Sequence, residues 1–293
     1  MDKIYIKEID NQDDFKECEK IQRELIQLNE VGIVPAYLLE LSSAHGGLTL
    51  GLYLNDKVIG YSFSLAAYSK DRGYYLFSDA MGFYRNYQRK SLGYIMKQVQ
   101  YQIAKEKGVK KIFWTYDPLL GPNANINIRK VGGTVCEYEL DRYSLINASS
   151  GVVIPADRFL LDWSIQTMRV KQRMIDGKLP EKMKTQREIK NCANRTIPIL
   201  FHAGSKPIVF REIAEYTLDN SQKTVLVEIP LEYMEIREIM PELAQDWRLK
   251  TRNIFHYFLN EEKYTVTDFF QVNDQGEIRN FYGLRQPKVN KNH

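Results

Sequence analysis

The chain has few cysteines and no long apolar run. Its 293 residues include three cysteines, Cys18, Cys136 and Cys192, which lie far apart in the sequence. Their number is odd and their spacing is not that of a metal site, so we expect reduced thiols in a cytoplasmic protein and no metal. Nowhere do about 18 apolar residues follow one another, so we expect no membrane span. The N-terminus MDKIYIKEID has no apolar core, unlike a signal peptide.

An excess of one charge is also missing. The chain has 41 Lys and Arg against 37 Asp and Glu, a net charge of +4, and no dense basic tract. This balance argues against nucleic acid as a partner and fits one electropositive cleft for an anionic cofactor. The apolar content of 44% is enough for one large core or two modest ones.

Apolar periodicity predicts strands and helices in alternation over the first 140 residues. The predicted elements are strand 3–9, helix 13–29, helix 35–43, strands 47–54, 57–68 and 73–84, a helix from residue 92 with Leu92, Ile95, Met96, Val99 and Ile103 on its apolar face, strand 108–116, helix 123–133 and strand 134–140. Antiparallel hairpins followed by strand–helix alternation predict an α/β protein, more closely an α+β mixed sheet with helices on its faces.

A small and polar stretch at residues 144–156 predicts a linker. We therefore expect a first domain over 1–145 and a C-terminal α+β extension or second lobe over 146–293 that contributes to the acceptor pocket. The elements predicted in this part are strand 157–165, an exposed helix or loop over 169–193, strands 207–212 and 223–229, helices within 231–260, and strands 264–271 and 279–284.

One strand-to-helix turn, NYQRKSLGYIMK at residues 86–97, carries the chemistry. A helix N-terminus presents unpaired N–H groups and a positive dipole end, which attract phosphate. Ser91 can cap the helix and donate its hydroxyl, and Arg89 and Lys90 add charge. Only Gly93 remains of a glycine-rich loop, so the turn by itself leaves two interpretations open, a basic helix start and a phosphate-binding turn.

The element order and this turn together resemble the GNAT superfamily of acyl-CoA-dependent N-acyltransferases. The signature of that family is Gln/Arg-x-x-Gly-x-Gly/Ala; Gln88 and Gly93 match its outer positions, and Ser91 stands at the usual middle glycine. The resemblance implies a GNAT fold, CoA pyrophosphate on the backbone of residues 88–94, and strands near 75–83 and 110–116 that splay apart for pantetheine. The cofactor-binding residues that it implies are Met81, Gly82, Phe83, Gln88, Arg89, Lys90, Ser91, Leu92, Gly93, Tyr94, Asn123 and Asn127.

Motifs along nearly the whole chain resemble a bacterial subgroup of predicted GNAT acetyltransferases with a C-terminal extension. These motifs are GGLTLGLYLNDKVIGYSFS, WTYDPL (114–119), NANIN (123–127), DRFLLDW (157–163) and WRLKTRNIF (247–255). The resemblance implies acetyl-CoA or succinyl-CoA as cosubstrate and an amino acid as acceptor. Three positions depart from the pattern: Phe77 and Asp79 stand where His is expected, and Ile128 where GNAT enzymes usually have the tyrosine proton donor.

Three side chains are candidates for proton transfer. Asp79 lies mid-strand among aromatic residues by parity, where burial would raise its pKa and suit a base; a structural Asp is the alternative. His45 precedes two glycines where the acceptor would enter, as base or substrate ligand, or as an ordinary loop histidine. Tyr116 is a candidate acid among 19 tyrosines. The thioester carbonyl itself would meet backbone N–H groups near residues 80–83, where this strand commonly bulges.

Three more residues are candidates for substrate binding. Arg248 and Arg252 are four apart on a helix and could clamp a carboxylate of the acceptor or of a succinyl group. The alternative is a solvated basic face paired with Glu242 or Asp246. Asp117 precedes a proline, and an Asx-turn is its alternative. Asn123 and Asn127, also four apart, could bind the pantetheine amides or cap a helix.

Three functional hypotheses follow. The first is a cytoplasmic acyl-CoA N-acyltransferase in which the amine of a small molecule attacks the thioester directly. The second is a non-catalytic acyl-CoA sensor, and the third is a protein lysine acetyltransferase. The expected partner is a small-molecule amine, and we expect no nucleic acid and no membrane as partners. Both a monomer and a homodimer are compatible with the sequence.

Overall fold

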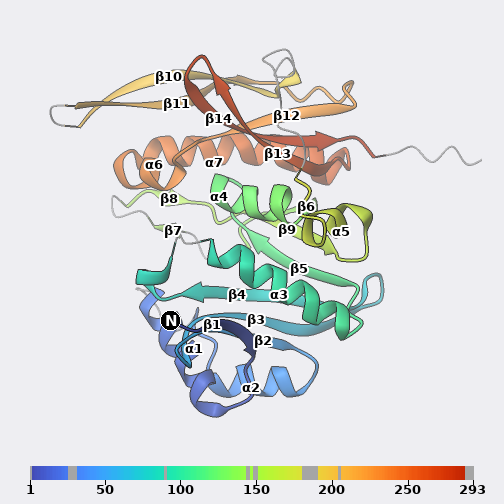
Figure 1. The fold of residues 1–293 in the computed structure, drawn as a ribbon. Coiled ribbons are helices and arrows are strands. Elements are labelled where there is room, and N and C mark those ends of the chain that lie inside the picture. Colours follow the sequence, from blue (N-terminus) through green and yellow to red (C-terminus); the bar gives the residue numbers. More distant parts are fainter. Residues whose placement is uncertain are drawn as a thin grey trace, which may run out of the picture. The chain divides into compact units, whose positions relative to one another are not determined.

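The computed structural model describes residues 2–25, 32–88, 91–142, 146–147, 151–179, 191–203 and 206–287. The chain divides into two compact units, one of Met1–Trp114 with Trp163–Gly177, the other of Thr115–Asp162 with Lys178–His293. Figure 1 shows the elements in chain order. Residues 115–145, which the sequence places in the first domain, group with the second unit.

The first unit begins with the predicted order of strands and helices. Its elements are β1 (Ile4–Glu8), α1 (Gln12–Leu25), α2 (Ala36–Ala44), β2 (Leu48–Leu54), β3 (Lys57–Ser69), β4 (Gly73–Phe83), the 3₁₀ turn η2 (Arg85–Tyr87), α3 (Leu92–Glu106), β5 (Lys111–Tyr116), whose last two residues pass into the second unit, and α5 (Met168–Met174).

The strands of the first unit follow the order β1-β2-β3-β4-β5. Neighbours are antiparallel except β4 and β5, which run parallel. α1 and α2 pack on the face of the sheet that carries Tyr61 and Phe63. Ser64, the next residue on β3, bonds α3 through Gln100. Because successive side chains of a strand alternate, the two helical layers cover opposite faces. This is the predicted mixed sheet with helices on its faces.

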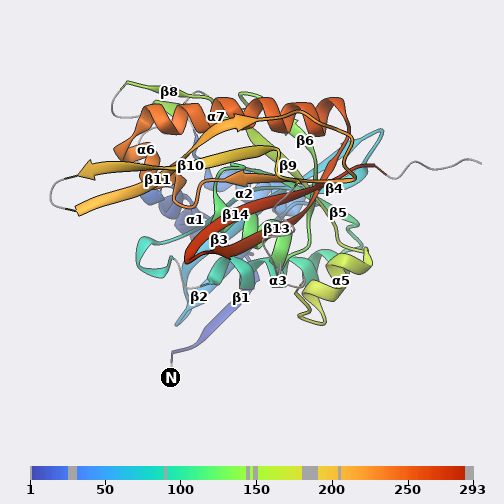
Figure 2. The ribbon, with the colours of Figure 1, turned by 90° about the horizontal axis from the view of Figure 1, so that it is seen from above.

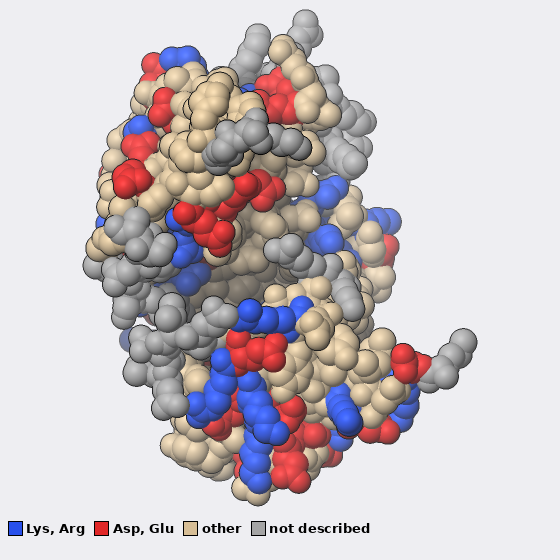
Figure 3. Space-filling model, turned by 90° about the vertical axis from the view of Figure 1, so that its left-hand side faces the viewer, with Lys and Arg blue, Asp and Glu red and all other residues tan. Residues whose placement is uncertain are grey.

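α1 is amphipathic, as its spacing predicts. Asn11 caps it by accepting from the backbone N–H of Asp14 at 3.0 Å, and Phe15, Cys18 and Ile21 are buried. Its outer face carries ion pairs three or four residues apart: Lys16–Asp13, Lys20–Glu17 and Arg23–Glu19. Figure 3 shows acidic and basic side chains intermixed on the lower part of the molecule.

The buried face of α3 differs from the predicted one. Ile95, expected in the apolar face, is exposed, whereas Met96, Lys97, Gln100, Tyr101 and Ala104 are buried. The apolar pattern was wrong because two long polar side chains on this face are buried with hydrogen-bond partners of their own.

The second unit contains elements that the sequence predicts and some that it does not. They are α4 (Gly121–Ala124), the π-helical turn η3 (Asn125–Lys130), β6 (Thr134–Glu139), β7 (Ile146–Asn147), β8 (Val153–Ile154), β9 (Arg158–Ser164), β10 (Asn194–Ala203), β11 (Lys206–Tyr216), β12 (Thr224–Ile229), α6 (Tyr233–Ile239), α7 (Pro241–Phe255), the π-helical turn η5 (His256–Glu261), β13 (Thr265–Asp274) and β14 (Glu277–Arg285). β10 and the two π-turns were not predicted, and β7 and β8 lie within the predicted linker.

The sheet of the second unit has the order β9-β6-β13-β14-β12. All of its neighbouring strands are antiparallel. Aromatic rings form its core; Phe159 lies 4.7 Å from Phe255 and 5.3 Å from Tyr282 between ring centroids. α7 lies along the β10–β11 hairpin (Figure 2), where Trp247 Nε1 donates to the carbonyl oxygen of Arg211 at 2.8 Å.

The three cysteines are free thiols in different settings. Cys18 is buried and Cys192 is half-buried, and burial raises the pKa of Cys192 to about 11. Cys136, on β6, is exposed. Among the described residues, no helix combines the length and apolarity that a membrane crossing needs, and no three His, Cys, Asp or Glu side chains are grouped to hold a metal ion.

Candidate active site

The first unit has an open groove of ≈ 680 Å³, here called the α2–β4 groove. Its apolar walls come from the approach to α2, α2 itself and β3, and two titratable side chains, His45 and Asp79, line it as well. The described residues that line it are Val34, Leu38, Leu41, Ser42, His45, Phe63, Leu65, Ala66 and Asp79. The structure therefore brings together two of the three predicted catalytic residues.

Asp79 enters this groove because β4 bulges. The β3–β4 register passes from Phe63↔Ala80 to Ser64↔Ser78, so Asp79 is an extra residue on β4. The bulge lies one residue before the stretch 80–83 where it is expected. The bulge also interrupts the alternation of side chains along β4, from which Asp79 was expected to lie on the same face as the aromatic residues. The Asp79 side chain is exposed, so the expectation of burial was wrong.

His45 ends α2 and has a defined tautomer when neutral. Its Nδ1 lies 2.8 Å from the carbonyl oxygen of Leu41. A carbonyl oxygen only accepts, so Nδ1 carries the hydrogen and Nε2 has the free lone pair. The following loop is held by Tyr74, whose hydroxyl donates to the carbonyl oxygen of Gly46 at 2.8 Å. His45 can thus accept a proton at Nε2.

The parallel pairing of β4 with β5 is short. Leu76 pairs with Ile112, and Phe77 pairs with Phe113. Within the described residues of the first unit the pairing of β4 with β5 ends at Phe77, although β4 continues to Phe83. The ladder between these strands therefore stops just before the bulge at Asp79.

The turn before α3 has an unusual backbone at Ser91. This residue has φ 60° and ψ 11°, the left-handed conformation that glycine favours. Its side chain makes no capping bond, so the predicted N-cap bond is absent. The resemblance places a glycine at this position, and the backbone here has the conformation of one. Arg89 and Lys90 lie outside the described residues.

The other predicted cofactor residues lie around this turn. A Cβ on Gly93 would lie 3.3 Å from Cε of Met81, and one on Gly82 only 2.5 Å from Cδ1 of Leu25. Gln88 donates its side-chain amide to the carbonyl oxygen of Phe83 at 3.2 Å. Leu92 and Tyr94 are half-buried in the first turn of α3. Met81 and Gly93 are therefore in contact range across β4 and α3.

Tyr116, the third predicted catalytic residue, belongs to the second unit and is 4% exposed. Its ring packs edge-on against Phe159 with centroids 5.7 Å apart, and burial raises the pKa of its phenol. Asn123 and Asn127 do not share an environment: Asn123 is exposed and Asn127 is buried. The π-turn that begins at Asn125 widens the helix between them, so the predicted four-residue face is wrong.

The predicted substrate residues are committed to internal ion pairs. Arg248 is fully buried, and its Nη2 lies 2.6 Å from both carboxylate oxygens of Asp117. Asp117 also accepts from the backbone N–H of Leu119 at 2.9 Å, the expected Asx-turn. The alternative of a solvated basic face paired with Glu242 or Asp246 is wrong for Arg248.

Arg252 pairs with two other carboxylates, Asp157 at 2.5 Å and Asp141 at 2.8 Å. Burial acts to raise the pKa of Asp157, but hydrogen bonds from Arg252, Asp141 and Tyr138 outweigh it and hold this pKa below its usual value. Both guanidinium groups thus have partners within the chain, and the sequence analysis missed Asp157 because nothing local links it to residue 252.

A buried lysine, Lys97, is a second feature that sequence reasoning does not reveal. Lys97 on α3 is 3% exposed, and its Nζ donates to Gln100 Oε1 at 3.0 Å and Ser78 Oγ at 3.2 Å. It also lies 3.8 Å from the centroid of the Trp114 ring. Burial lowers its pKa to about 7. The signal in the sequence was the pair Lys97 and Gln100, three apart on the face toward the serines of β3 and β4.

Comparison with solved structures returns acetyltransferases, mostly bacterial, that cover about 55% of this chain. The ribosomal-protein-S18-alanine N-acetyltransferase from Escherichia coli is 12% identical, with a TM-score of 0.44 over 56% of this chain and 96% of that one. A GNAT-family acetyltransferase from Streptococcus pneumoniae is 14% identical, with a TM-score of 0.42 over 55% and 98%. Naa50 from Arabidopsis thaliana, in complex with the bisubstrate analogue CoA-Ac-MVNAL, is 13% identical, with a TM-score of 0.41 over 54% and 97%.

No protein-family model matches the sequence. No curated protein matches it either.

Proposed function

We propose that the chain is an acyl-CoA-dependent N-acyltransferase whose acceptor amine enters the α2–β4 groove. The observation that carries the proposal is on β4: its pairing with β5 ends at Phe77, and two residues later a bulge directs Asp79 to the groove. The thioester of the bound acyl-CoA would lie along this part of β4. The CoA pyrophosphate would lie at the N-terminus of α3, where the first N–H groups have no partner inside the helix.

The reaction is direct acyl transfer. The neutral amine attacks the thioester carbonyl carbon, an N–C bond forms, the C–S bond breaks, and CoA leaves as a thiolate that takes up a proton. The amine loses one proton, which His45 Nε2 or Asp79 would accept because both line the groove. The Asp79 carboxylate also attracts the ammonium form of the acceptor into the groove, and this form gives up its extra proton to water before the neutral amine attacks.

The groove favours an acceptor with an apolar body. Six of its lining residues are apolar, namely Val34, Leu38, Leu41, Phe63, Leu65 and Ala66, and its described lining contains one carboxylate and no Lys or Arg. We therefore extend the proposal to a small primary amine with an aliphatic or aromatic side chain. An amino acid fits the apolar wall, but the guanidinium clamp expected for its carboxylate is engaged with Asp117, Asp157 and Asp141.

The decisive experiment measures free thiol released from acetyl-CoA and succinyl-CoA with matched acceptors, leucine against isoamylamine and phenylalanine against phenethylamine. We expect turnover with at least one acceptor of the panel and a higher rate for the amine of each pair. Thiol release that no acceptor accelerates, together with tight CoA binding, would identify a sensor. Turnover of lysine peptides alone would favour the protein acetyltransferase.

Two variants locate the site. Gly93→Glu adds bulk next to Met81 and negative charge at the start of α3, so we expect CoA binding to be lost. Gln102→Glu adds the same charge at an exposed position of α3, so we expect it to bind CoA normally.

Asp79→Asn should lower kcat and leave CoA affinity near that of the wild type; full activity across pH 6–9 would exclude Asp79 as the base.

A further inference from the structure

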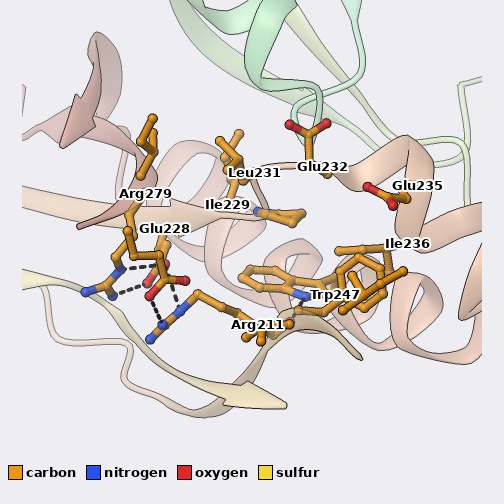
Figure 4. A pocket seen from close by; sticks show the side chains of 15 residues that line it. Arg211, Glu228, Ile229, Leu231, Glu232, Glu235, Ile236, Trp247 and Arg279 are labelled. Atoms are coloured by element: carbon orange, nitrogen blue, oxygen red, sulfur yellow. Dashed lines mark hydrogen bonds and ion pairs between the residues drawn. The ribbon is translucent and has the colours of Figure 1, made fainter. Parts of the chain in front are cut away.

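A second cavity lies within the second unit, here called the β11–α6 pocket. Its volume is ≈ 260 Å³, and its walls come from β11, β12, β14 and the start of α6, with Trp247 of α7 beside them. Figure 4 shows Arg211, Glu228 and Arg279 grouped on one side and Glu232 and Glu235 on the other. None of these residues belongs to the proposed acyltransfer site.

The ionic side of the pocket is satisfied internally. Glu228 is 2% exposed and accepts from Arg279 Nη2 at 2.6 Å and from Thr196 Oγ1 at 2.7 Å. Arg279 Nη1 donates to Asp274 at 2.6 Å. Arg211 donates through Nε to Thr196 Oγ1 at 2.7 Å and through Nη1 to Glu277 at 2.7 Å. Because their donors are engaged, these arginines fix the wall and do not offer an anion site.

Trp247 lies at the apolar wall. Its indole N–H is used by the carbonyl oxygen of Arg211 at 2.8 Å, and the whole side chain is buried behind the wall, where it supports the apolar residues in front of it. Ile208, Phe210, Ile229, Ile236 and Ile278 also line it. The accessible apolar surface of the pocket comes from Val209, Leu231 and Ile278, which are 40–59% exposed and suit the apolar or aromatic body of a small molecule.

The charge of the pocket is negative. Four glutamates and two arginines line it, a net charge of −2. Glu232 and Glu235 are exposed, and within the part of the chain that the structure describes neither side-chain carboxylate has a hydrogen bond or ion pair. They lie at the entrance to α6, where carboxylates favour the helix dipole. That structural role leaves their outward oxygens available to a ligand.

We infer that the β11–α6 pocket binds a small organic cation, an ammonium or guanidinium group on an apolar or aromatic body. The cationic group pairs with Glu232 and Glu235, and the body packs against the exposed aliphatic side chains of Val209, Leu231 and Ile278. The cavity of ≈ 260 Å³ is slightly smaller than the range of roughly 300–1,000 Å³ for small-molecule sites, so the ligand is no larger than an arylalkylamine. The structure carries this inference independently of the proposed acyl transfer.

The test compares phenethylamine with 3-phenylpropionate, which have similar bodies and opposite charges, by isothermal titration calorimetry on the full chain. We expect phenethylamine to bind and 3-phenylpropionate not to bind. Glu232→Gln with Glu235→Gln should weaken phenethylamine binding by about tenfold, equivalent to about 1.4 kcal/mol. Glu238→Gln, an exposed change on the same helix outside the lining, should leave the affinity unchanged.

A second pair of variants fixes the location. Ile278 lines the pocket and is 49% exposed, so Ile278→Arg should fold and abolish binding by repulsion, whereas Ile278→Gln should retain it. Asp79→Asn should leave this binding unchanged, which separates it from binding in the α2–β4 groove. No binding of phenethylamine, equal binding of both probes, or full affinity in the double glutamine variant would overturn the inference and leave the two glutamates as helix-stabilising residues only.

Discussion

Ser91 has a left-handed backbone conformation and lies at the proposed pyrophosphate site. A non-glycine residue in the left-handed region destabilises the folded state by on the order of 1–2 kcal/mol. Glycine removes this strain, but its greater freedom in the unfolded chain destabilises the fold by about 0.4–1 kcal/mol. We therefore expect Ser91→Gly to raise the free energy of unfolding by about 0.5 kcal/mol, measured by urea denaturation. Ser91→Ala keeps the Cβ and should not gain stability.

The same two variants separate the hydroxyl from the backbone in CoA binding. Both lack the hydroxyl, so weaker CoA binding in both would assign a phosphate contact to Ser91 Oγ. Weaker binding in Ser91→Ala alone would assign the effect to the backbone conformation. A loss of stability in Ser91→Gly would contradict the strain at φ 60°.

Lys97 predicts a specific pH dependence of stability. Burial lowers its pKa from 10.5 to about 7 in the folded chain, so between pH 7 and 10.5 the unfolded chain binds more protons. Stability contributed by this residue therefore rises with pH across that window, by on the order of 5 kcal/mol at about 1.36 kcal/mol per pH unit. Lys97→Met should remove this rise in urea denaturation at several pH values, and Lys105→Met, exposed on the same helix, should retain it. An unchanged pH profile in Lys97→Met would contradict the buried neutral amine.

At the scale of elements, the sequence predicts the strands and helices from β1 to β5 well because their apolar residues recur with a clear period; α5, in a weakly periodic region, is predicted only as an exposed helix or loop. It predicts the facing of α3 wrongly because Lys97 and Gln100 count as polar, although Ser64 and Ser78 satisfy them inside. The bulge at Asp79 and the π-turn at Asn125 are shifts in strand and helix register, and the apolar period of a sequence does not reveal such shifts. The partner of Arg248 lies 131 residues away, and a local period does not reveal a distant contact either.

The ion pair between Asp117 and Arg248 joins the turn after β5 to α7 and yields a test of its role. Asp117→Asn leaves a fully buried guanidinium without its counter-charge, so we expect a loss of about 3–5 kcal/mol in the free energy of unfolding. The double variant Asp117→Asn with Arg248→Met should recover much of it in urea denaturation. Asp246→Asn, which breaks the half-buried pair with Lys250 on the same helix, should cost less than about 1 kcal/mol because water still reaches both groups. Near-normal stability of Asp117→Asn with a raised KM for the acceptor would instead favour the predicted substrate role.

At the scale of the whole molecule, the sequence predicts two contiguous domains, whereas the contacts group residues that are not contiguous. The small, polar stretch 144–156 looks like a linker by composition. The returning segment Trp163–Gly177 nevertheless belongs to the first unit. In it, Trp163 packs against Trp114 with ring centroids 5.6 Å apart, and Ile165 donates its backbone N–H to the carbonyl oxygen of Lys110 at 3.1 Å. Composition marks where a chain is polar, but it does not show where a later segment packs.

This division predicts how fragments fold. A fragment of residues 1–145 lacks Trp163, Ile165 and Val170, which are at most 2% exposed in the full chain, and it retains residues 115–145 without the second unit. We expect it to lack near-UV circular dichroism and a cooperative thermal transition. A fragment in which Trp114 is joined to Trp163 by a short Gly/Ser linker contains the first unit entire, so it should show both signals. Replacing Trp163 by Ala in the joined fragment should cost about 3–5 kcal/mol and abolish the transition. A cooperative transition of the fragment 1–145 would instead support the contiguous domain that the sequence predicts.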